Sequence, residues 1–598
     1  NAAPLIEGRA MTQTPDKPAF LNVATSATGR RWVGPSIEED RLAEAMAQIT
    51  KLPAPLCRTL VKRGVTAEDA STFLAPTLRD LLPDPHDLRD MEKAAQRFLV
   101  AVKTKQRIAI FADYDVDGGT SAALLICWLR DMGLKSTLYI PDRIDEGYGP
   151  NDEAMAALAK DHDLIICVDC GTLSHGPIAA VVGADVIVLD HHLGGETLPD
   201  CVAVVNPNRQ DESGDLGHLC AAGVVFLMLV EANRQMKASG AAGPDLMSAL
   251  DLVALGTVAD VAPLIGVNRA FVRQGLTVMG RRGRIGITAL SDVAGMNEAP
   301  NSYHLGFLLG PRVNAGGRIG KADLGARLLA TVDRNEASAL ADMLDQLNTE
   351  RREVESAVRD LAIEQAEARG YDAPLVWAAG KNWHPGVVGI VASRLKDASN
   401  RPSVVIGIDE DGTGKGSGRS VTGIDLGAAI QRLASEGLLI KGGGHKMAAG
   451  LSVEGDKIEA AMARLGELLA KQGSDKIGPA DLKLDGVLMP AAATVELVNQ
   501  IEQAGPFGAG APAPRFVFPD VQILFAKTVG ANHLKITFGD GLGKRIDSIS
   551  FGAMDGPLGP MLTNHNGARF HLAGRLEINT WQGRQSVQLR LEDAAPAA

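Results

Sequence analysis

The sequence predicts two α/β domains joined by a long helix and followed by a small β-barrel. Three observations lead to this fold class. Apolar strands alternate with short helices from about residue 106, and a second pattern of this kind begins at 371. Such alternation is typical of α/β domains with parallel sheets. Between the two patterns, residues 336–369 carry apolar residues at helical spacing, and several short alternating strands follow residue 516.

A chain of 598 residues is too long for one compact domain. Residues 1–10 resemble a remnant of an expression vector, because Ile6-Glu7-Gly8-Arg9 is similar to a protease recognition site. The expected divisions are this remnant (1–10), a mostly helical N-terminal segment (11–105), a first α/β domain (106–335), a connecting helix (336–370), a second α/β domain (371–475) and a barrel with its entering segment (476–598).

The first α/β domain is predicted to begin with a helix and a buried strand. MEKAAQRFLVAVKT (91–104) has helical spacing, RIAIFAD (107–113) is typical of a buried strand, and TSAALLICWLRDMG (120–133) predicts a helix that ends at its glycine. Further strands are predicted at STLYIPD, DLIICVD (163–169), DVIVLD (185–190) and AVVNPN, with helices between them. In open parallel sheets, ligands bind beyond the carboxyl ends of the strands.

Acidic residues gather at these strand ends. They lie in FADYDVDGGTS, VDCG and DHH, and a further aspartate closes the apolar helix MSALDLVALGTVADV. So much charge is costly to bury without compensation, and a mixed carboxylate and imidazole set suits Mn²⁺ or Mg²⁺. The candidate residues of this metal centre are Asp113, Asp115, Asp117, Asp169, Asp190, His191, His192 and Asp260.

Their chemistry suggests two cations. Asp115 and Asp117 leave a strand end two residues apart and can face one cavity, while the glycines after them let the backbone turn. Asp169 can bridge two ions, because each carboxylate has two oxygens. Two cations about 3.5–4 Å apart would hold the attacking and leaving oxygens of a phosphoryl displacement and lower the pKa of a bound water.

The histidines complete this prediction. His191 or His192 can supply a nitrogen ligand. Asp190 can orient that histidine without binding the ion itself. Each segment alone has a simpler explanation, since an Asp-x-Asp pair is often a turn or a helix N-cap and an Asp-His-His run can be a solvated loop. A single calcium loop is another alternative, although the spacing of an EF-hand is absent. The four segments together favour a catalytic metal centre.

Glycine-rich segments carry the candidate phosphate-binding residues. GPRVNAGGRIG (310–320) is predicted to be a loop whose guanidinium groups and free amides suit phosphate oxygens, with an ordinary turn and surface arginines as the alternative. GKGSGRS (414–420) has the same character, and WHPG and GGGH each place a histidine beside glycine. The candidates are Arg312, Asn314, Arg318, His384, Lys415, Ser417, Arg419, Ser420 and His445.

The connecting helix and the barrel complete the predicted fold. The helix has apolar residues three to four apart opposite a charged face, so it is expected to bridge two domains, with a simple surface helix as the alternative. RFVFPDVQILFAK, HLKITF, RIDSISFG, RFHLAGRLEINTW and RQSVQLRLED predict a five-stranded barrel such as an OB-fold. Barrel side chains expected to contact single-stranded nucleic acid are His533, Lys535 and Trp581.

Composition limits the class of protein. No run of 18 apolar residues and no signal peptide is present, which predicts a cytoplasmic protein without a membrane span. Six scattered cysteines, including Cys167 and Cys170, form no disulfide framework or zinc pattern. The net charge of −12 argues against nucleic acid as a partner, unless metal ions neutralise some carboxylates and a basic groove is local.

The ordered motifs resemble the DHH phosphoesterase family. The matching segments, from about 107 to 516, are ADYDVDGGTS, VDCG, LDHH, VNPN, GTVADVAPL, GPRVNAGGR, WHPGVVGIVASRL, KGSGRS, GGGHKMAAGL and PFGAGAPAPRF. The two α/β domains would then be of the DHH and DHHA1 types. The first motif set would be shared with pyrophosphatases and small nucleotide phosphodiesterases, whereas the second domain and the barrel are similar to the branch of exonucleases specific for single-stranded DNA.

The resemblance implies a function. It implies a 5′-to-3′ exonuclease that degrades single-stranded DNA to mononucleotides with two Mn²⁺ or Mg²⁺ ions in recombination and repair, as a monomer, with a single-strand-binding protein and a helicase as partners. The implied metal ligands are Asp113, Asp115, Asp117, Asp169, His191 and Asp260, with His192 nearby, and the implied phosphate contacts are Arg312, Asn314, Arg318, Arg419 and His445. The alternatives are a small-molecule phosphodiesterase or pyrophosphatase, and a non-catalytic protein that binds single strands.

Overall fold

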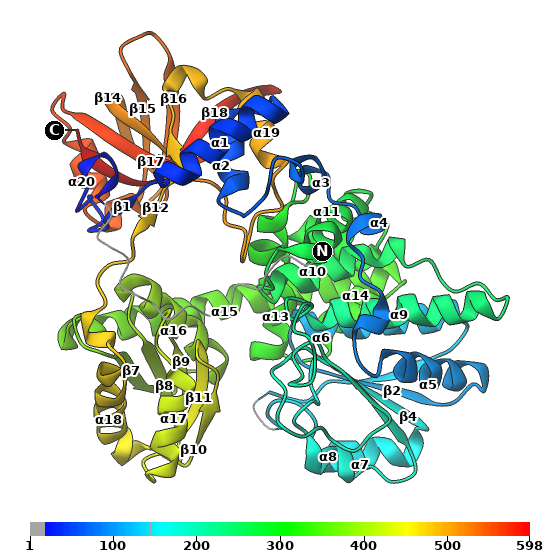
Figure 1. The fold of residues 1–598 in the computed structure, drawn as a ribbon. Coiled ribbons are helices and arrows are strands. Elements are labelled where there is room, and N and C mark those ends of the chain that lie inside the picture. Colours follow the sequence, from blue (N-terminus) through cyan, green and yellow to red (C-terminus); the bar gives the residue numbers. More distant parts are fainter. Residues whose placement is uncertain (1–17, 144–145, 598) are drawn as a thin grey trace. The chain divides into compact units, whose positions relative to one another are not determined.

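A computed structural model describes residues 18–143 and 146–597 of the chain (Figure 1). The vector remnant predicted at 1–10 lies outside the described residues. The chain folds into two compact units. One consists of the described residues up to Ala75, Gly478–Gly505 and the described residues from Pro512, and the other consists of Pro76–Ile477 and Pro506–Ala511.

A five-stranded parallel sheet forms the centre of the first α/β domain. Its order is β3-β2-β4-β5-β6, with bounds β2 (Ile108–Ala112), β3 (Ser136–Tyr139), β4 (Leu164–Val168), β5 (Asp185–Leu189) and β6 (Ala203–Val205). Side chains alternate between the two faces, so Ile108 and Ile110 pack on one side while Ala109 and Phe111 pack on the other. The parallel arrangement brings the carboxyl ends of all five strands to one edge.

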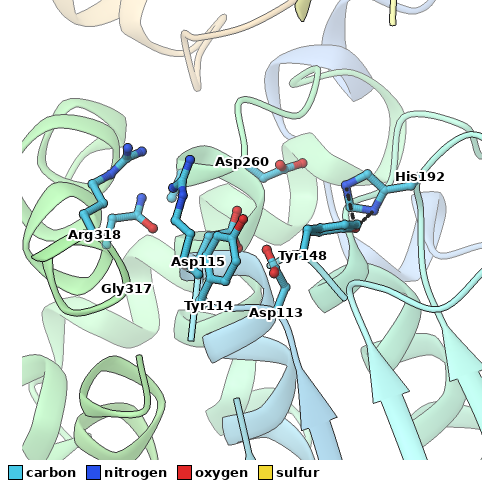
Figure 2. A pocket seen from close by; sticks show the side chains of 11 residues that line it. Asp113, Tyr114, Asp115, Tyr148, His192, Asp260, Gly317 and Arg318 are labelled. Atoms are coloured by element: carbon cyan, nitrogen blue, oxygen red, sulfur yellow. Dashed lines mark hydrogen bonds between the residues drawn. The ribbon is translucent and has the colours of Figure 1, made fainter. Parts of the chain in front are cut away.

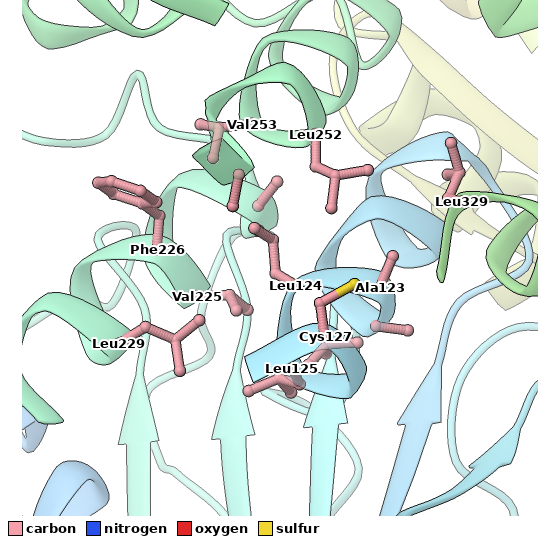
Figure 3. Close-up of a cluster of buried hydrophobic side chains, with 14 of the residues drawn as sticks. Ala123, Leu124, Leu125, Cys127, Val225, Phe226, Leu229, Leu252, Val253 and Leu329 are labelled. Atoms are coloured by element: carbon pink, nitrogen blue, oxygen red, sulfur yellow. The ribbon is translucent and has the colours of Figure 1, made fainter. Parts of the chain in front are cut away.

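Helices cover both faces of this sheet. One face is covered by α5 (Met91–Lys103), α6 (Val116–Asp131) and α9 (Ala221–Ala238), with α10 (Leu250–Ala259) packed on α6 and α9, and the other by α7 (Asp152–Asp161) and α8 (His175–Ala179). Figure 3 shows Leu124 of α6, Phe226 of α9 and Leu252 of α10 in one apolar cluster. Burial of each such side chain contributes about 1.5–3 kcal/mol to the free energy of unfolding. This packing fixes the carboxyl end of α10 relative to the sheet.

Helix α6 begins four residues earlier than predicted. Its first residue is Val116, and Asp115 is the N-cap, whose Oδ1 accepts hydrogen bonds from the amides of Asp117 and Gly118 at 2.8 and 3.1 Å. The prediction that the two glycines form a turn before the helix is therefore wrong. A Cβ on Gly118 would collide with the Asp113 carbonyl, so glycine permits a close return of the chain at this point.

The segment predicted to be a glycine-rich loop at 310–320 is instead a helix. A π-helix, η4 (His304–Leu309), runs directly into α13 (Gly310–Ile319). A Cβ on Gly317 would lie 2.5 Å from the Tyr114 carbonyl oxygen. Glycine therefore lets α13 pack against the backbone that carries the first aspartates, and tertiary packing outweighs the low helix propensity of glycine.

The predicted connecting helix is confirmed as α15 (Arg334–Arg369). Near its start, Leu340 and Leu344 pack in the core of the first domain, whereas Val358 and Ala362 pack in the second. The short helices α11 (Gly266–Gly280), α12 (Ile285–Val293) and α14 (Leu324–Ala330) complete the region before it.

The second α/β domain contains a mixed sheet in the order β10-β11-β9-β8-β7. Its elements are β7 (Val376–Lys381), α16 (Pro385–Ser399), β8 (Ser403–Ile408), β9 (Thr413–Arg419), α17 (Leu426–Ser435), β10 (Lys441–Gly444), β11 (Ala448–Glu454) and α18 (Ile458–Lys471). The predicted loop GKGSGRS is thus mostly strand β9. A Cβ on Gly416 would lie 3.0 Å from atoms of both Ile406 and Leu451, which explains glycine in a strand.

The other unit contains the predicted barrel. Five long strands form it, β14 (Phe516–Val529), β15 (His533–Gly539), β16 (Arg545–Ser550), β17 (Arg569–Trp581) and β18 (Arg584–Pro596), and β14 also pairs with β17 to close it. N-terminal elements α1 (Ile37–Thr50) and α2 (Ala54–Val61) belong to the same unit. There the indole of Trp32 donates to the buried carboxylate of Asp593 at 3.0 Å.

None of the helices in the described ranges combines the length and apolarity that a bilayer crossing requires.

Candidate metal centre and anion pocket

The predicted acidic residues converge at the carboxyl edge of the parallel sheet. Asp113 follows β2, Asp169 follows β4 and Asp190 follows β5, while Asp260 is the C-cap of α10. Figure 2 shows Asp113, Asp115 and Asp260 around one pocket, with His192 at its side. The aspartates that follow β2, β4 and β5 therefore lie together at the strand ends, as the sequence predicted.

Two carboxylates of the first segment are anchored by helix amides. Asp115 caps α6 through Oδ1. Asp117 is fully buried and accepts hydrogen bonds from the amides of Ala221 and Ala222, at 2.6 and 2.9 Å, at the start of α9. A helix N-terminus carries partial positive charge and stabilises a carboxylate there. Asp117 is thereby fixed in place beside the remaining ligands.

His191 lies at the centre of the cluster. Its Nε2 is 3.2 Å from Asp169 Oδ1, 3.7 Å from Asp117 Oδ2 and 3.8 Å from Asp260 Oδ2. Three groups of ligand atoms each lie within 4.8 Å of one another, namely Asp113-Asp115-Asp169, Asp117-His191-Asp260 and Asp169-His191-His192. Asp169 and His191 each occur in two of these groups, so the groups adjoin one another.

Several buried atoms of the cluster have no hydrogen-bond partner. Asp113 Oδ1, Asp169 Oδ1 and His191 Nε2 are all buried and all unsatisfied. Such groups are uncommon in native proteins, because an unpaired buried polar atom costs about 1–3 kcal/mol. Oxygen and imidazole atoms aimed at a shared space fit Mn²⁺ or Mg²⁺.

The electrostatics of the site also call for cations. Burial, followed by the neighbouring charge of Asp115, raises the pKa of Asp113 and of Asp169 well above the ordinary value. Burial and the charges of Asp117 and Asp115 raise the pKa of Asp260 to about 9. Carboxyls that resist ionisation in each other's company are those that a divalent ion would stabilise as carboxylates.

Asp190 has a different environment and a different role. Its Oδ2 accepts from the Thr172 hydroxyl at 2.6 Å, and its Oδ1 accepts from His192 Nδ1 at 2.8 Å. Burial alone would raise the pKa of Asp190, but the hydrogen bonds from His192 and Thr172 hold it well below the ordinary value. Asp190 is thus an ionised carboxylate that orients the His192 ring. It also accepts from the His191 amide, which fixes the backbone that carries both histidines.

Residues not singled out in the sequence support the histidines. Asn206 Nδ2 donates to the His192 carbonyl at 2.8 Å and Asn208 Nδ2 donates to the His191 carbonyl at 2.6 Å. The Tyr148 hydroxyl bonds the Asp169 carbonyl at 3.1 Å and reaches His192 Nδ1 at 3.0 Å (Figure 2). In the sequence, the position of Asn206 and Asn208 at the end of a predicted strand was the signal that could have identified these two residues.

The residues of the three groups form one cluster, which we name the metal-ligand cluster: Asp113, Asp115, Asp117, Asp169, His191, His192 and Asp260. This cluster adjoins a pocket of about 330 Å³. Tyr114, Arg143, Asn314 and Arg318 line it together with the acidic residues. A neighbouring pocket of about 230 Å³ also contains Arg143 and Arg318 and adds Arg419 of β9. Burial, then the charges of nearby arginines, lowers the pKa of Arg318 to about 10. Three crowded guanidinium groups beside the candidate metal ligands have the chemistry to hold an anion such as phosphate.

The structure places the other predicted phosphate contacts outside these pockets. Arg312 donates to Asp345 Oδ1 at 2.8 Å and to the Leu308 carbonyl at 2.8 Å. Ser420 is buried and donates to the Ile424 carbonyl at 2.9 Å. These two side chains therefore have partners within the fold.

The four further candidates do not line either pocket. Ser417 Oγ accepts from Arg419 Nη1 at 2.9 Å. His384 is the N-cap of α16, and burial followed by the charge of Arg143 lowers its pKa. Lys415 and His445 are exposed.

The barrel candidates differ in exposure. Trp581 is 73% exposed at the end of β17. His533 accepts from the Gly552 amide at 3.1 Å and contacts the exposed Phe551 ring, while Lys535 lies within β15.

Comparisons with known proteins agree with this architecture. The DHH family N-terminal domain matches residues 107–257, the DHHA1 domain matches 372–471 and the RecJ OB domain matches 484–593. The Bacillus subtilis protein described as single-stranded-DNA-specific exonuclease RecJ is 35% identical over 95% of this chain and 71% of its own length. The Escherichia coli protein of the same description is 37% identical over 94% of this chain and 98% of its own.

Solved structures extend the comparison. The crystal structure of RecJ from Thermus thermophilus in complex with Mn²⁺ has a TM-score of 0.76 at 28% identity and covers 94% of this chain and 79% of that chain. A structure from the same organism in complex with Mg²⁺ has a TM-score of 0.70 at 27% identity, covering 94% and 78%.

The DHH and DHHA1 matches define the class of the protein, a DHH phosphoesterase. Within this class, the chain belongs to the RecJ family, because two relatives at least 35% identical align with it over most of their own length. The family resemblance and the fold class predicted from the sequence are confirmed.

Proposed function

We propose that the protein is a metal-dependent exonuclease that removes mononucleotides from the 5′ end of single-stranded DNA. The observation that carries this proposal is the cluster of buried, unpaired carboxylate and imidazole atoms at the strand ends, next to an arginine-lined pocket. The names of the relatives, which describe exonucleases specific for single-stranded DNA, supply the substrate class.

The ligand set would hold two divalent ions. Asp113, Asp115 and Asp169 form one group, and Asp117, His191 and Asp260 form another close by. Divalent ions bound by these groups would supply a water of lowered pKa and neutralise charge on the reacting phosphate. The chain's own contribution is to fix the ligands by helix amides and by the hydrogen bonds of Asp190.

The arginines give a reason for cleavage at an end. Arg143 and Arg318 line both pockets, and Arg419 closes the second. A terminal phosphate carries more negative charge than an internal diester, so crowded guanidinium groups favour it. A strand whose 5′ phosphate binds there would present its first internal phosphodiester to the metal-ligand cluster. We therefore propose Arg143, Arg318 and Arg419 as the contacts of the terminal phosphate, with Asn314 beside them.

A second candidate is hydrolysis of small phosphodiesters. A pocket of about 330 Å³ accommodates one nucleotide as readily as the end of a strand. The barrel favours the polymer, because OB-type barrels commonly bind single strands through basic and aromatic side chains such as Lys535 and Trp581.

Substrate competition tests the proposal. With Mn²⁺ present, single-stranded DNA should be degraded at least about 100-fold faster than blunt duplex DNA, dinucleotides or pyrophosphate, because only the strand uses all the contacts. Faster hydrolysis of dinucleotides than of DNA would support the small-molecule function instead. Arg419→Ala should lose preference for a 5′-phosphorylated strand, whereas Arg432→Ala, which removes an exposed guanidinium paired with Glu436 on α17, should not.

A further inference from the structure

The loop after Asp260 begins with a residue in an uncommon backbone conformation. Val261 has φ +60, in the left-handed region, and its side chain is 69% exposed. A β-branched residue seldom adopts this conformation, and such strain persists only where surrounding structure enforces it. The end of α10 closes locally around this residue, because the Val261 amide donates to the Val258 carbonyl at 3.2 Å and the Ala262 amide donates to the Thr257 carbonyl at 3.1 Å. In the loop itself, the Pro263 carbonyl accepts from Asn268 Nδ2 at 3.0 Å.

A distant part of the chain contacts the same loop. Residues 506–511, which we name the finger, interrupt the barrel unit and pack within the unit that contains the metal-ligand cluster. The Leu264 amide donates to the Ala509 carbonyl at 2.8 Å. Ala511 is 2% exposed and lies in the main core cluster of the first α/β domain. The finger therefore contacts the loop that begins immediately after Asp260.

Glycines shape the finger for this contact. Gly508 and Ala511 exchange two backbone hydrogen bonds of 3.0 and 3.1 Å, which closes a tight turn. Gly510 has φ +66, and a Cβ there would lie 3.1 Å from the Cβ of Pro263. A side chain at this position would be strained and would press on the loop.

One arginine fixes both ends of the finger. Arg63, just after α2 in the barrel unit, donates from Nη1 to the Ala504 carbonyl at 2.7 Å and from Nη2 to the Pro512 carbonyl at 3.0 Å. These carbonyls flank the points where the chain leaves the barrel unit and returns to it. A single planar guanidinium thus sets the distance between the segment that enters the finger and the segment that leaves it.

We infer that the finger is a positioning element for Asp260, holding residues 261–265 so that this carboxylate points into the metal-ligand cluster. The inference rests on the proposed metal-dependent function. Its chemical consequence is that one metal position depends on residues far from it in sequence, at Gly510 and Arg63. Substitution of these residues should weaken metal binding without altering any ligand.

The test measures Mn²⁺ binding directly, by the electron paramagnetic resonance signal of free Mn²⁺ added to the full chain. Gly510→Val and Arg63→Ala should each weaken binding of one Mn²⁺ by about 10-fold, the lower end of the range for groups that orient metal ligands. Arg63→Lys should not restore it, because an ammonium cannot span both carbonyls in a plane. Hydrolysis at saturating Mn²⁺ should return to within about 2-fold of the original rate, with an unchanged KM for DNA, since Mn²⁺ binding is the step affected.

Two matched variants serve as controls. Lys62→Ala removes the neighbouring side chain, which donates to the Leu484 carbonyl at 2.9 Å and does not hold the finger. Gly567→Val places the same side chain at a glycine of φ +78 in the barrel unit, in open space. Both should bind Mn²⁺ as the original chain does. Unchanged Mn²⁺ affinity in either folded finger variant, or an equal loss in the controls, would overturn the inference. A chain that shows the predicted Mn²⁺ changes but degrades no DNA would contradict the proposed function and leave the inference standing.

Discussion

Asn206 illustrates how residues behind the metal ligands control the site. Its amide joins the His192 carbonyl to the Thr172 hydroxyl, which in turn bonds Asp190. Asn206→Ala should therefore lower Mn²⁺ affinity and activity by about 10–100-fold, the range for such supporting groups. Activity measured over a Mn²⁺ titration checks this.

A half-buried, hydrogen-bonded asparagine provides the control for that change. Asn233 accepts from the Trp128 indole at 3.0 Å, away from the metal-ligand cluster. Asn233→Ala should cost stability but leave the Mn²⁺ dependence unchanged. Similar Mn²⁺ dependences for the two variants would show that Asn206 has only a structural role.

The raised pKa values of the ligand carboxyls predict how metal and pH act together. Without metal, Asp113, Asp169 and Asp260 have folded-state pKa values above their ordinary values. Such groups stabilise the fold at low pH, and this contribution is lost as pH rises through the folded pKa. For Asp260 the window runs from its ordinary 3.8 to about 9.

Metal ions bind the deprotonated carboxylates and remove this penalty. The increase in Tm on adding Mn²⁺ should therefore be larger at about pH 8.5 than at about pH 6, and the metal-free protein should lose stability between these values. Thermal melts with and without a chelator measure both effects. A Mn²⁺ shift that shrinks as pH rises would be inconsistent with the raised pKa values.

The sequence predicted where the candidate site residues lie better than it predicted their individual contacts. Strand ends locate aspartates, because the backbone of a parallel sheet fixes where they emerge, and this placed Asp113, Asp169 and Asp190 together. Side-chain partners depend on tertiary packing, which the pattern does not contain. Arg312 accordingly pairs with Asp345, while Arg143 was missed because nothing in its local sequence distinguishes it from a surface arginine.

At the scale of elements, packing of α13 on the first aspartate segment is the most sensitive contact. Gly317→Ala would place a Cβ 2.5 Å from the Tyr114 carbonyl oxygen, against backbone that cannot easily move. Helix α13 should shift and carry Asn314 and Arg318 with it. We expect a loss of about 1–3 kcal/mol in stability, typical of overpacking, and a raised KM for single-stranded DNA.

Gly466 in α18 is the matched control for that substitution. It also lies inside a helix, but a Cβ there would meet only Leu375 at 4.0 Å. Gly466→Ala should stabilise the protein by about 0.5–1 kcal/mol and leave KM unchanged. Denaturant unfolding and steady-state kinetics distinguish the two variants, and equal behaviour would remove the special role of Gly317.

The same helix shows where secondary-structure prediction failed. Glycine favours loops by local propensity, so the segments at 310–320 and 414–420 were predicted to be loops. In the structure the glycines instead permit close contacts, with Tyr114 in α13 and with Ile406 and Leu451 in β9. Elements with regular apolar patterns, such as α15 and the barrel strands, agreed with the prediction because burial and local pattern point the same way.

At the scale of the whole molecule, charge distribution matters more than net charge. The chain carries −12 overall, yet Arg143, Arg318 and Arg419 are concentrated around the two pockets. Affinity for single-stranded DNA should therefore fall steeply with salt, by about 0.7 in log affinity per log unit of salt for each phosphate contacted. Arg419→Ala should reduce the slope by roughly one contact, as measured by fluorescence anisotropy in a chelator. A flat salt response would contradict a basic DNA path.

The association of the N-terminal segment with the barrel could not be predicted from the sequence. Trp32 reaches Asp593 across more than 500 positions of chain, and β1 (Trp32–Val33) pairs with β12 (Leu482–Lys483) in parallel. No local periodicity encodes such a pairing, because it depends on which distant segments the tertiary fold brings together. The barrel strands themselves were predicted because each carries its own alternating pattern.

We expect the Asp and His cluster at the strand ends to hydrolyse DNA. The most direct measurement follows nucleotide release from single-stranded DNA labelled at the 5′ or the 3′ end, with Mn²⁺, for the original chain and for Asp169→Ala. Mononucleotides should appear first from the 5′ label, and Asp169→Ala should release none while still binding the strand. Release that begins at the 3′ label, or persists in Asp169→Ala, would contradict the claim.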